Sequence, residues 1–308
     1  MRIVLGSRGS ELARAQTALV VEALRAVSPE TEITIEIIRT KGDEKSGAEI
    51  RLEPVHPQQG RKGMFTAVIE RALLDGRIDV AVHSAKDLPS EATEGLEVCA
   101  ALARAPIEEV LVAKAAGGLA ALAEGATVAT GSVRRQYQLH RRRADLHVVE
   151  LNGNVPTRLR KLSANEWDAI VLARAGLERL GYDCALGELD FEGQTLRVTI
   201  LATEEFLPAG GQGIVALQTR GDDEAAKQLL AKVNDAETFE CLRAEREFLR
   251  LLRGDCGTPV GVMAEVYDGE MKMRAQLFGE GWAEPRRATA RGVEPEAVAA
   301  RLWELIDG

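Results

Sequence analysis

Four short segments of this sequence bring hydroxyl, glycine and cationic residues together, and each directly follows an apolar run typical of a buried strand. The segments are residues 6–10, 83–87, 130–135 and 152–158. In a doubly wound sheet, the carboxyl ends of neighbouring strands meet at one edge, where helix N-termini present free N–H groups. Because arginine also binds carboxylates and phosphates through two parallel hydrogen bonds, the pattern predicts a crevice for a ligand with several negative charges.

The individual residues also have simpler explanations. A single arginine after a strand, such as Arg174 or Arg179, is more often a solvated surface residue, and residues 141–143 fit that description. Ser10 and Ser132 stand where they could serve only as helix caps. The occurrence of four such segments at successive strand ends favours the anion site over the separate explanations.

Asp87 directly follows Lys86 and is the one acid within these four segments. Surrounding positive charge keeps a carboxylate ionised, since opposite charges lower its pKa. Such a group is suited to stabilising a developing cation or to passing a proton. A plain ion pair with Lys86 is the alternative interpretation.

Cys256 lies in a glycine-rich turn that spans residues 253–261. A cysteine in such a turn is accessible, unlike Cys99, which lies within an apolar run. The nearby Arg253 favours the reactive thiolate. A covalent role is one interpretation of this turn, and an ordinary exposed cysteine is the other.

Secondary-structure elements must hold these segments in place, and the pattern of apolar residues indicates that they form two α/β domains. Short β-branched runs alternate with amphipathic helical segments, as in doubly wound folds. Strands are expected at residues 2–5, 33–38, 78–82, 96–102, 110–113, 127–129, 147–151, 168–172 and 214–217. Residues 43–62 and 183–196 are expected to be mobile or inserted loops, the second centred on a turn at Glu192-Gly193-Gln194.

The pattern changes near residue 235, where a helix is followed by two strand-like runs at residues 261–267 and 271–278. We therefore expect three domains. The first comprises residues 1–103 and 212–234, and the second comprises residues 104–211. The third, residues 235–308, is a small α+β domain that carries Cys256.

The composition narrows the class of protein. The 308 residues carry a net charge of −9, which disfavours a nucleic-acid or membrane-surface role, because both favour a basic face. No apolar stretch approaches the roughly 20 residues that a membrane-spanning helix requires. The four cysteines and four histidines are dispersed, so no metal site is expected. We predict a cytoplasmic protein.

Together, the chemistry-bearing segments resemble those of the hydroxymethylbilane synthase family, also called porphobilinogen deaminase. The similarity runs nearly the whole length of the chain. The matching motifs include Gly6-Ser7-Arg8-Gly9-Ser10, His83-Ser84-Ala85-Lys86-Asp87, Ser132-Val133-Arg134-Arg135-Gln136, Gly153-Asn154-Val155, Ala175-Gly176-Leu177, Gly211-Gln212-Gly213 and the turn around Cys256.

The resemblance implies that the first two domains are like periplasmic solute-binding proteins. It also implies a dipyrromethane cofactor bound through a thioether to Cys256. By the same match, the residues that hold this cofactor are Ser84, Lys86, Asp87, Thr130, Ser132, Arg134, Arg135 and Arg158. The residues expected to contact the substrate, porphobilinogen, are Arg8, Ser10, Phe65, Arg158 and Arg179.

In the family, the substrate loses ammonia to form an azafulvene, which the terminal pyrrole α-carbon attacks. Four such steps precede the hydrolysis that releases hydroxymethylbilane. The resemblance assigns the stabilisation of the cationic centres to Asp87, and it implies a monomer. Nothing in it requires a metal, a nucleic acid or a membrane.

One departure from the family pattern concerns carboxylate binding. Asn152 stands where the family usually has an arginine, and Arg160 and Lys161 are possible substitutes. Two other functions stay open at this point. One is a non-catalytic anion receptor, which would not need Cys256 or Asp87, and the other is a paralogue with impaired catalysis.

Overall fold

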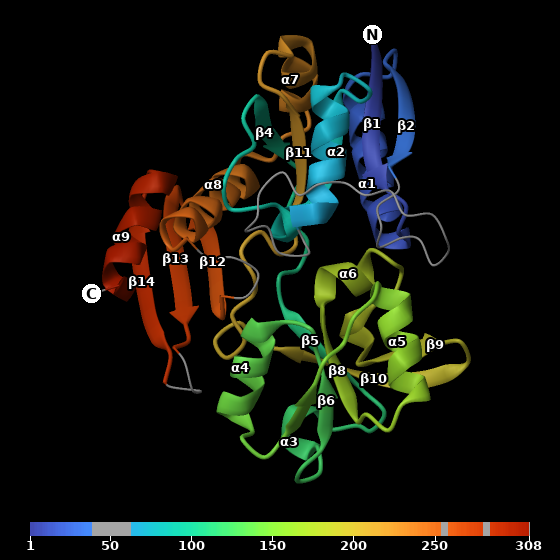
Figure 1. The fold of residues 1–308 in the computed structure, drawn as a ribbon, viewed down its shortest axis with the longest axis vertical. Helices are drawn as coiled ribbons and strands as arrows, with labels where there is room; N and C mark the ends of the chain where they lie inside the picture. The colour runs from blue at the N-terminus through green and yellow to red at the C-terminus, as the bar shows by residue number, and fades with distance from the viewer. Residues whose placement is uncertain (39–62, 254–257, 280–283, 308) are drawn as a thin grey trace.

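The computed structural model describes residues 1–38, 63–253, 258–279 and 284–307. Within these residues the strands form three sheets, two in α/β layers and one in an α+β unit (Figure 1). The expected class of fold is therefore confirmed. No helix among the described residues is long and apolar enough to cross a membrane.

The first sheet has the strand order β2-β1-β3-β11-β4. β1 pairs in parallel with β2 and β3, whereas β11 runs antiparallel to both β3 and β4. Helices α1, α2 and α7 pack around this sheet, and its core includes Ile3, Leu5 and Leu217. The bounds are β1 Arg2–Arg8, α1 Glu11–Val27, β2 Glu32–Ile38, α2 Gly63–Leu74, β3 Val80–Ser84, β4 Leu96–Ala101, β11 Val215–Arg220 and α7 Glu224–Ala231.

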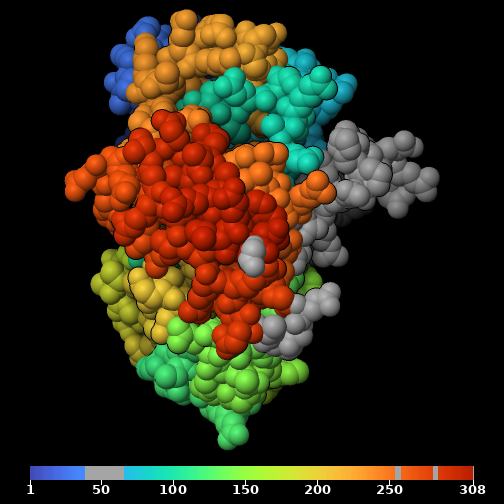
Figure 2. All heavy atoms as spheres, turned by 90° about the vertical axis from the view of Figure 1, so that its left-hand side faces the viewer, coloured from blue at the N-terminus to red at the C-terminus, as the bar shows by residue number. Residues whose placement is uncertain are grey.

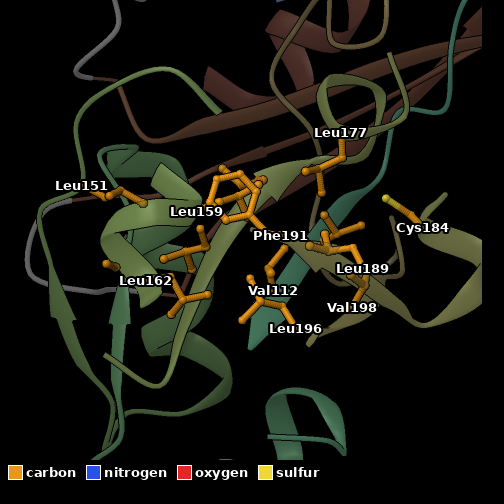
Figure 3. Packing of buried hydrophobic residues seen from close by; sticks show 14 residues of the cluster. Val112, Leu151, Leu159, Leu162, Leu177, Cys184, Leu189, Phe191, Leu196 and Val198 are labelled. Atoms are coloured by element: carbon orange, nitrogen blue, oxygen red, sulfur yellow. The ribbon is translucent and has the colours of Figure 1, made fainter. Parts of the chain in front are cut away.

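The second sheet has the strand order β7-β6-β8-β5-β10-β9. On one of its faces, leucines of α5 and β10 pack against the side chains of β5 and β9, as Figure 3 shows. The bounds are β5 Glu109–Ala113, α3 Gly118–Ala121, β6 Thr127–Ala129, α4 Val133–Arg142, β7 His147–Val149, α5 Val155–Ala164, β8 Ala169–Ala173, α6 Arg174–Glu178, β9 Glu188–Phe191 and β10 Gln194–Leu201.

The expectation of a loop at residues 183–196 is wrong. This segment contains a 3₁₀ turn at Cys184–Leu186, strand β9 and the start of β10, which pairs antiparallel with β9. The turn of the hairpin is where the sequence placed it, since Glu192 and Gly193 both have positive φ angles. The strands form because their alternate residues, such as Phe191 and Leu196, are buried against the second sheet's core.

The third sheet contains three antiparallel strands in the order β12-β13-β14, covered by two helices. Strand β14 was not expected from the sequence, because its edge position leaves most of its polar side chains in water. The core between sheet and helices includes Phe248, Met273 and Leu302. The bounds are α8 Ala236–Leu251, β12 Val260–Tyr267, β13 Glu270–Leu277, β14 Arg286–Gly292 and α9 Pro295–Asp307.

The chain passes between the first two sheets twice, after β4 and again after β10. The two crossings lie side by side, since the Ala105 N–H donates to the carbonyl of Gly213 over 3.0 Å. In Figure 2 the C-terminal residues lie across the level at which the first two α/β units meet. The exact domain boundaries stay a prediction, which this strand membership supports.

Candidate functional site

The end of β3 and the turn that follows it carry three of the predicted site residues: Ser84, Lys86 and Asp87. A 3₁₀ turn at Ala85–Asp87 follows the strand directly. The Ser84 hydroxyl exchanges hydrogen bonds of 2.8 and 3.0 Å with the amide of Gln16 on α1. The sequence did not lead us to Gln16, although a glutamine next to the apolar face of α1 could have indicated a polar contact inside the protein.

Lys86 contacts the second of the two crossings. Its Nζ lies 3.4 Å from Oε1 of Gln212, whose Nε2 donates to the carbonyl of Ile107 over 2.8 Å. Gly211 has a φ of +74°, and a Cβ built there would lie 2.9 Å from the backbone nitrogen of Lys86. The backbone of this crossing therefore packs directly against the turn that carries Lys86.

Thr130 and Ser132 organise the N-terminus of α4. The Thr130 hydroxyl accepts from the Ser132 N–H over 3.2 Å, and Ser132 caps the helix by accepting from the Arg135 N–H. Thr130 is fully buried, whereas Ser132 is partly exposed. Both hydroxyls thus hold the strand-to-helix turn that presents the following arginines.

Arg134 and Arg135 are both buried, and both pair with Glu109, the first residue of β5. Arg134 Nη2 lies 2.5 Å from one carboxylate oxygen and Arg135 Nη2 lies 2.6 Å from the other. Burial alone would raise the pKa of Glu109, but Arg135 and Arg134 outweigh it and lower the pKa to about 2. Sequence reasoning missed Glu109, because it reads as an ordinary polar residue before a strand.

Arg158, on α5, connects this cluster to Asp87. Its burial lowers its pKa to about 10, and the like charge of Arg135 adds to the shift while the carboxylate of Asp87 opposes it. The structure therefore brings Asp87 of the first α/β unit within electrostatic range of Arg158 on the second. The side chain of Arg158 also donates from Nε to the carbonyl of Gly153 over 2.6 Å.

The residues predicted to face the substrate lie at other strand and helix ends. Ser10 caps α1 by accepting from the Ala13 N–H, and Arg8 ends β1. Arg179 donates from Nη2 to the carbonyl of Gly213 over 2.7 Å, and burial lowers its pKa to about 10. Ser10 is thus held by a contact within its own α/β unit, whereas Arg179 contacts the second crossing.

Two predicted residues cannot be placed. Cys256 and the side chain of Phe65 lie outside the described residues. The three cysteines that the structure describes are poor nucleophiles, because burial raises the pKa of Cys99 and Cys184 to about 11 and that of Cys241 to about 12.

The possible substitutes for the arginine missing at Asn152 are already engaged. Arg160 pairs with Glu192 over 2.8 Å and lies against the ring of Phe191. Lys161 donates to the carbonyl of Asn152 over 2.9 Å. The side chain of Asn152 itself donates to Glu150. Arg160 and Lys161 are therefore not positioned to replace the missing arginine in the cationic cluster.

The donor set fits a ligand with several carboxylates. The Nε atoms of Arg135 and Arg179 are buried and have no hydrogen-bond partner among the described residues. Such donors are costly to bury unless a ligand or water accepts from them. No group of three His, Cys, Asp or Glu side chains in the described part of the chain could hold a metal ion.

The sequence was also compared with models of known protein families, and two of them match. Residues 3–228 match the family model "Porphobilinogen deaminase, dipyromethane cofactor binding domain", and residues 239–305 match "Porphobilinogen deaminase, C-terminal domain". Among solved structures, the methionine-binding protein MetQ is similar over 78% of this chain and 92% of that chain, with a TM-score of 0.45 and 14% identity.

Curated relatives match over nearly their whole length. Porphobilinogen deaminase of Roseiflexus sp. (strain RS-1) is 42% identical, with 99% of this chain and 96% of the relative covered. The enzyme of that name from Nitrobacter winogradskyi is 41% identical, covering 96% and 89%, and that from Geobacillus kaustophilus is 38% identical, covering 99% and 93%. The chain belongs to the porphobilinogen deaminase family.

Proposed function

We propose that the protein is a hydroxymethylbilane synthase. It condenses four porphobilinogen units, each with loss of ammonia, onto a covalently bound dipyrromethane cofactor, and hydrolysis then releases linear hydroxymethylbilane. The observation that carries the proposal is the position of Asp87, an acid within electrostatic range of Arg158 in a cluster of buried and half-buried cations. Porphobilinogen carries two carboxylates per ring, so a cationic crevice with one catalytic acid suits it.

The cofactor would be held at the facing ends of the first two sheets. Lys86, Arg135 and Arg158 supply cations for its carboxylates, together with Arg134 by family resemblance. Ser84, Thr130 and Ser132 supply hydroxyls. The cofactor is attached at Cys256 in this proposal, which the raised pKa values of Cys99, Cys184 and Cys241 support.

The cofactor, when bound, supplies a nucleophilic pyrrole α-carbon. The chain's own residues bind and orient the substrate and stabilise its charge. In each step a carbon–nitrogen bond of the substrate breaks and ammonia leaves. A carbon–carbon bond then forms, and the pyrrole α-carbon that attacked loses its proton. The carboxylate of Asp87 stabilises the cation that develops on the substrate as ammonia departs. Arg8, Ser10, Phe65, Arg158 and Arg179 are proposed to contact the substrate.

The proposal also covers the cellular location of the enzyme, its oligomeric state and its partners. We infer a cytoplasmic monomer with no nucleic-acid or membrane partner, for which the acidic net charge of −9 is the supporting feature. The domain boundaries at residues 103/104, 211/212 and 234/235 are proposed together with it.

Intact-mass measurement of the purified protein, followed by peptide mapping, tests the function. The expected result is an added mass of two porphobilinogen units less two ammonias, located on Cys256, and consumption of porphobilinogen in a turnover assay. An unmodified protein that stays unmodified after incubation with porphobilinogen would instead indicate an anion-binding protein. An adduct without turnover would indicate a paralogue with impaired catalysis.

A further inference from the structure

Glu109 is a fully buried acid near the proposed site, and the family match assigns it no role. Its side chain is inaccessible to solvent, and its two oxygens each pair with a different arginine. The neighbouring Glu108 is unlike it, since it is partly exposed and pairs with Arg174 over 3.2 Å. A carboxylate that bridges two adjacent arginines fixes both guanidinium groups relative to β5.

The two arginines are held differently. Arg134 donates from Nη1 to Gln138 and to the carbonyl of Leu207, over 2.9 and 2.7 Å, so both its terminal nitrogens are engaged within the protein. Arg135 donates from Nη1 to the carbonyl of Val171 over 2.8 Å, yet its Nε stays buried with no hydrogen-bond partner in the part of the chain that the structure describes. Of the pair, Arg135 is thus the one that keeps a buried donor for a ligand.

Charge gives Glu109 a second effect. Arg135 and Arg158 are close enough to disfavour each other's positive charge, and Lys86 also lies within electrostatic range of Glu109. Without an internal carboxylate, these cations would repel one another in a medium that screens charge poorly. Glu109 offsets part of that repulsion while leaving the Nε donor of Arg135 unoccupied.

We propose that Glu109 is a positioning residue, which holds the Arg135 guanidinium so that its Nε–H can bind a carboxylate of the cofactor. Rigid support of this kind decides how precisely a binding group is placed. The inference rests on the proposed function. It adds that the cofactor-binding arginines require an internal anion that touches neither cofactor nor substrate.

The test is the rate of cofactor loading in the variant Glu109→Gln. Glutamine has nearly the same shape, but its amide N–H groups face an arginine that also only donates. Cofactor-free protein is incubated with porphobilinogen, and intact mass follows the fraction that carries the adduct over time. Loading should slow by about tenfold or more, the size expected when a hydrogen bond to a charged group is lost.

The matched control is Glu108→Gln, which makes the same change one residue earlier and should load at the wild-type rate. Circular dichroism and thermal unfolding establish whether each variant is folded. A merely structural role for Glu109 would lower thermal stability but leave loading of the folded variant unchanged. Folded Glu109→Gln protein that loads at the wild-type rate therefore overturns the proposal.

If Glu109→Gln does not fold, Glu109→Asp decides the question by the same assay. Its shorter carboxylate keeps the charge but cannot reach both guanidinium groups, so loading should be about fivefold slower. Loading at the wild-type rate overturns the proposal. If the wild-type protein itself forms no adduct, the proposed function fails, and this outcome is distinct from a failure confined to Glu109.

Discussion

Arg104 and the fully buried Glu245 form an ion pair, with Nη1–Oε1 and Nη2–Oε2 distances of 2.8 and 3.1 Å. Glu245, on α8, also accepts hydrogen bonds from the backbone N–H groups of Gly211 and Ala264. Arg104 donates from Nε to the carbonyl of Gln212. One carboxylate thus ties the C-terminal unit to both crossings between the first two sheets.

Replacing Glu245 by alanine should destabilise the protein by about 3–5 kcal/mol, because the largely buried charge of Arg104 would lose its partner. Urea unfolding measures this change. The control is Glu247→Ala on the same helix, whose pair with the exposed Arg250 should be worth about 0.5 kcal/mol or less. Equal losses of free energy in the two variants would contradict the assigned importance of the buried pair.

Asp87→Ala should lower the rate of condensation by about 10²-fold or more, because the cation that develops on the substrate loses its stabilising carboxylate. The variant should stay folded, since Asp87 is partly exposed in a short turn. The rate of porphobilinogen consumption at saturating substrate checks this. Near-normal turnover in a folded Asp87→Ala protein would rule out the proposed role.

Cys256→Ser should yield protein without a bound pyrrole adduct, because the hydroxyl is a far weaker nucleophile than a thiolate. Intact mass gives the answer directly. Cys99→Ser is the control, and it should keep the adduct, since burial raises the pKa of the Cys99 thiol to about 11 and leaves it protonated near neutral pH. An adduct on the Cys256→Ser protein would place the attachment elsewhere.

The lowered pKa of Glu109 predicts how the free energy of unfolding changes in acid. Folding lowers its pKa from 4.5 to about 2, so its contribution is fully present above about pH 4.5 and is lost as pH falls through about 2. Between these values the wild-type protein should lose more unfolding free energy than Glu109→Gln, which has no carboxyl to titrate. Urea unfolding at neutral pH and at roughly pH 3 compares the two. Parallel losses would show that Glu109 does not contribute.

Gly211→Ala should both destabilise the protein and slow catalysis. A non-glycine residue at its positive φ is strained by about 1–3 kcal/mol, and the added Cβ would meet the backbone of Ala85 and Lys86 at 2.9 Å. Gly76→Ala is the control, because Gly76 has a similar φ but open space around its Cβ position. The control should lose stability without losing turnover. Normal turnover in Gly211→Ala would mean that the crossing does not position the Lys86 turn.

The strand-end segments and helix caps could be predicted because they depend on local sequence. Ser10 and Ser132 cap helices at the positions considered for caps, and the strands that precede the cationic segments lie within a few residues of their predicted positions. Apolar runs followed by cap residues specify such elements without reference to distant parts of the chain.

The contacts that organise the site could not be predicted, because they join residues far apart in sequence. Glu109 pairs with arginines that lie 25 and 26 residues later in the sequence. Gln16 contacts Ser84 only because α1 packs beside β3. Strand β14 was missed for a related reason, since an edge strand can be polar on most of its length. Tertiary packing alone brings these groups together.

Strand β11 lies between β3 and β4 and forms hydrogen bonds with both, yet it follows every strand of the second sheet in the sequence. During synthesis, β3 and β4 therefore emerge long before the strand that joins them. The second sheet has all its strands by Leu201 and can close on its own. The first sheet cannot be completed until β11 has been synthesised. We therefore expect the second sheet, from the middle of the chain, to fold before the first during synthesis.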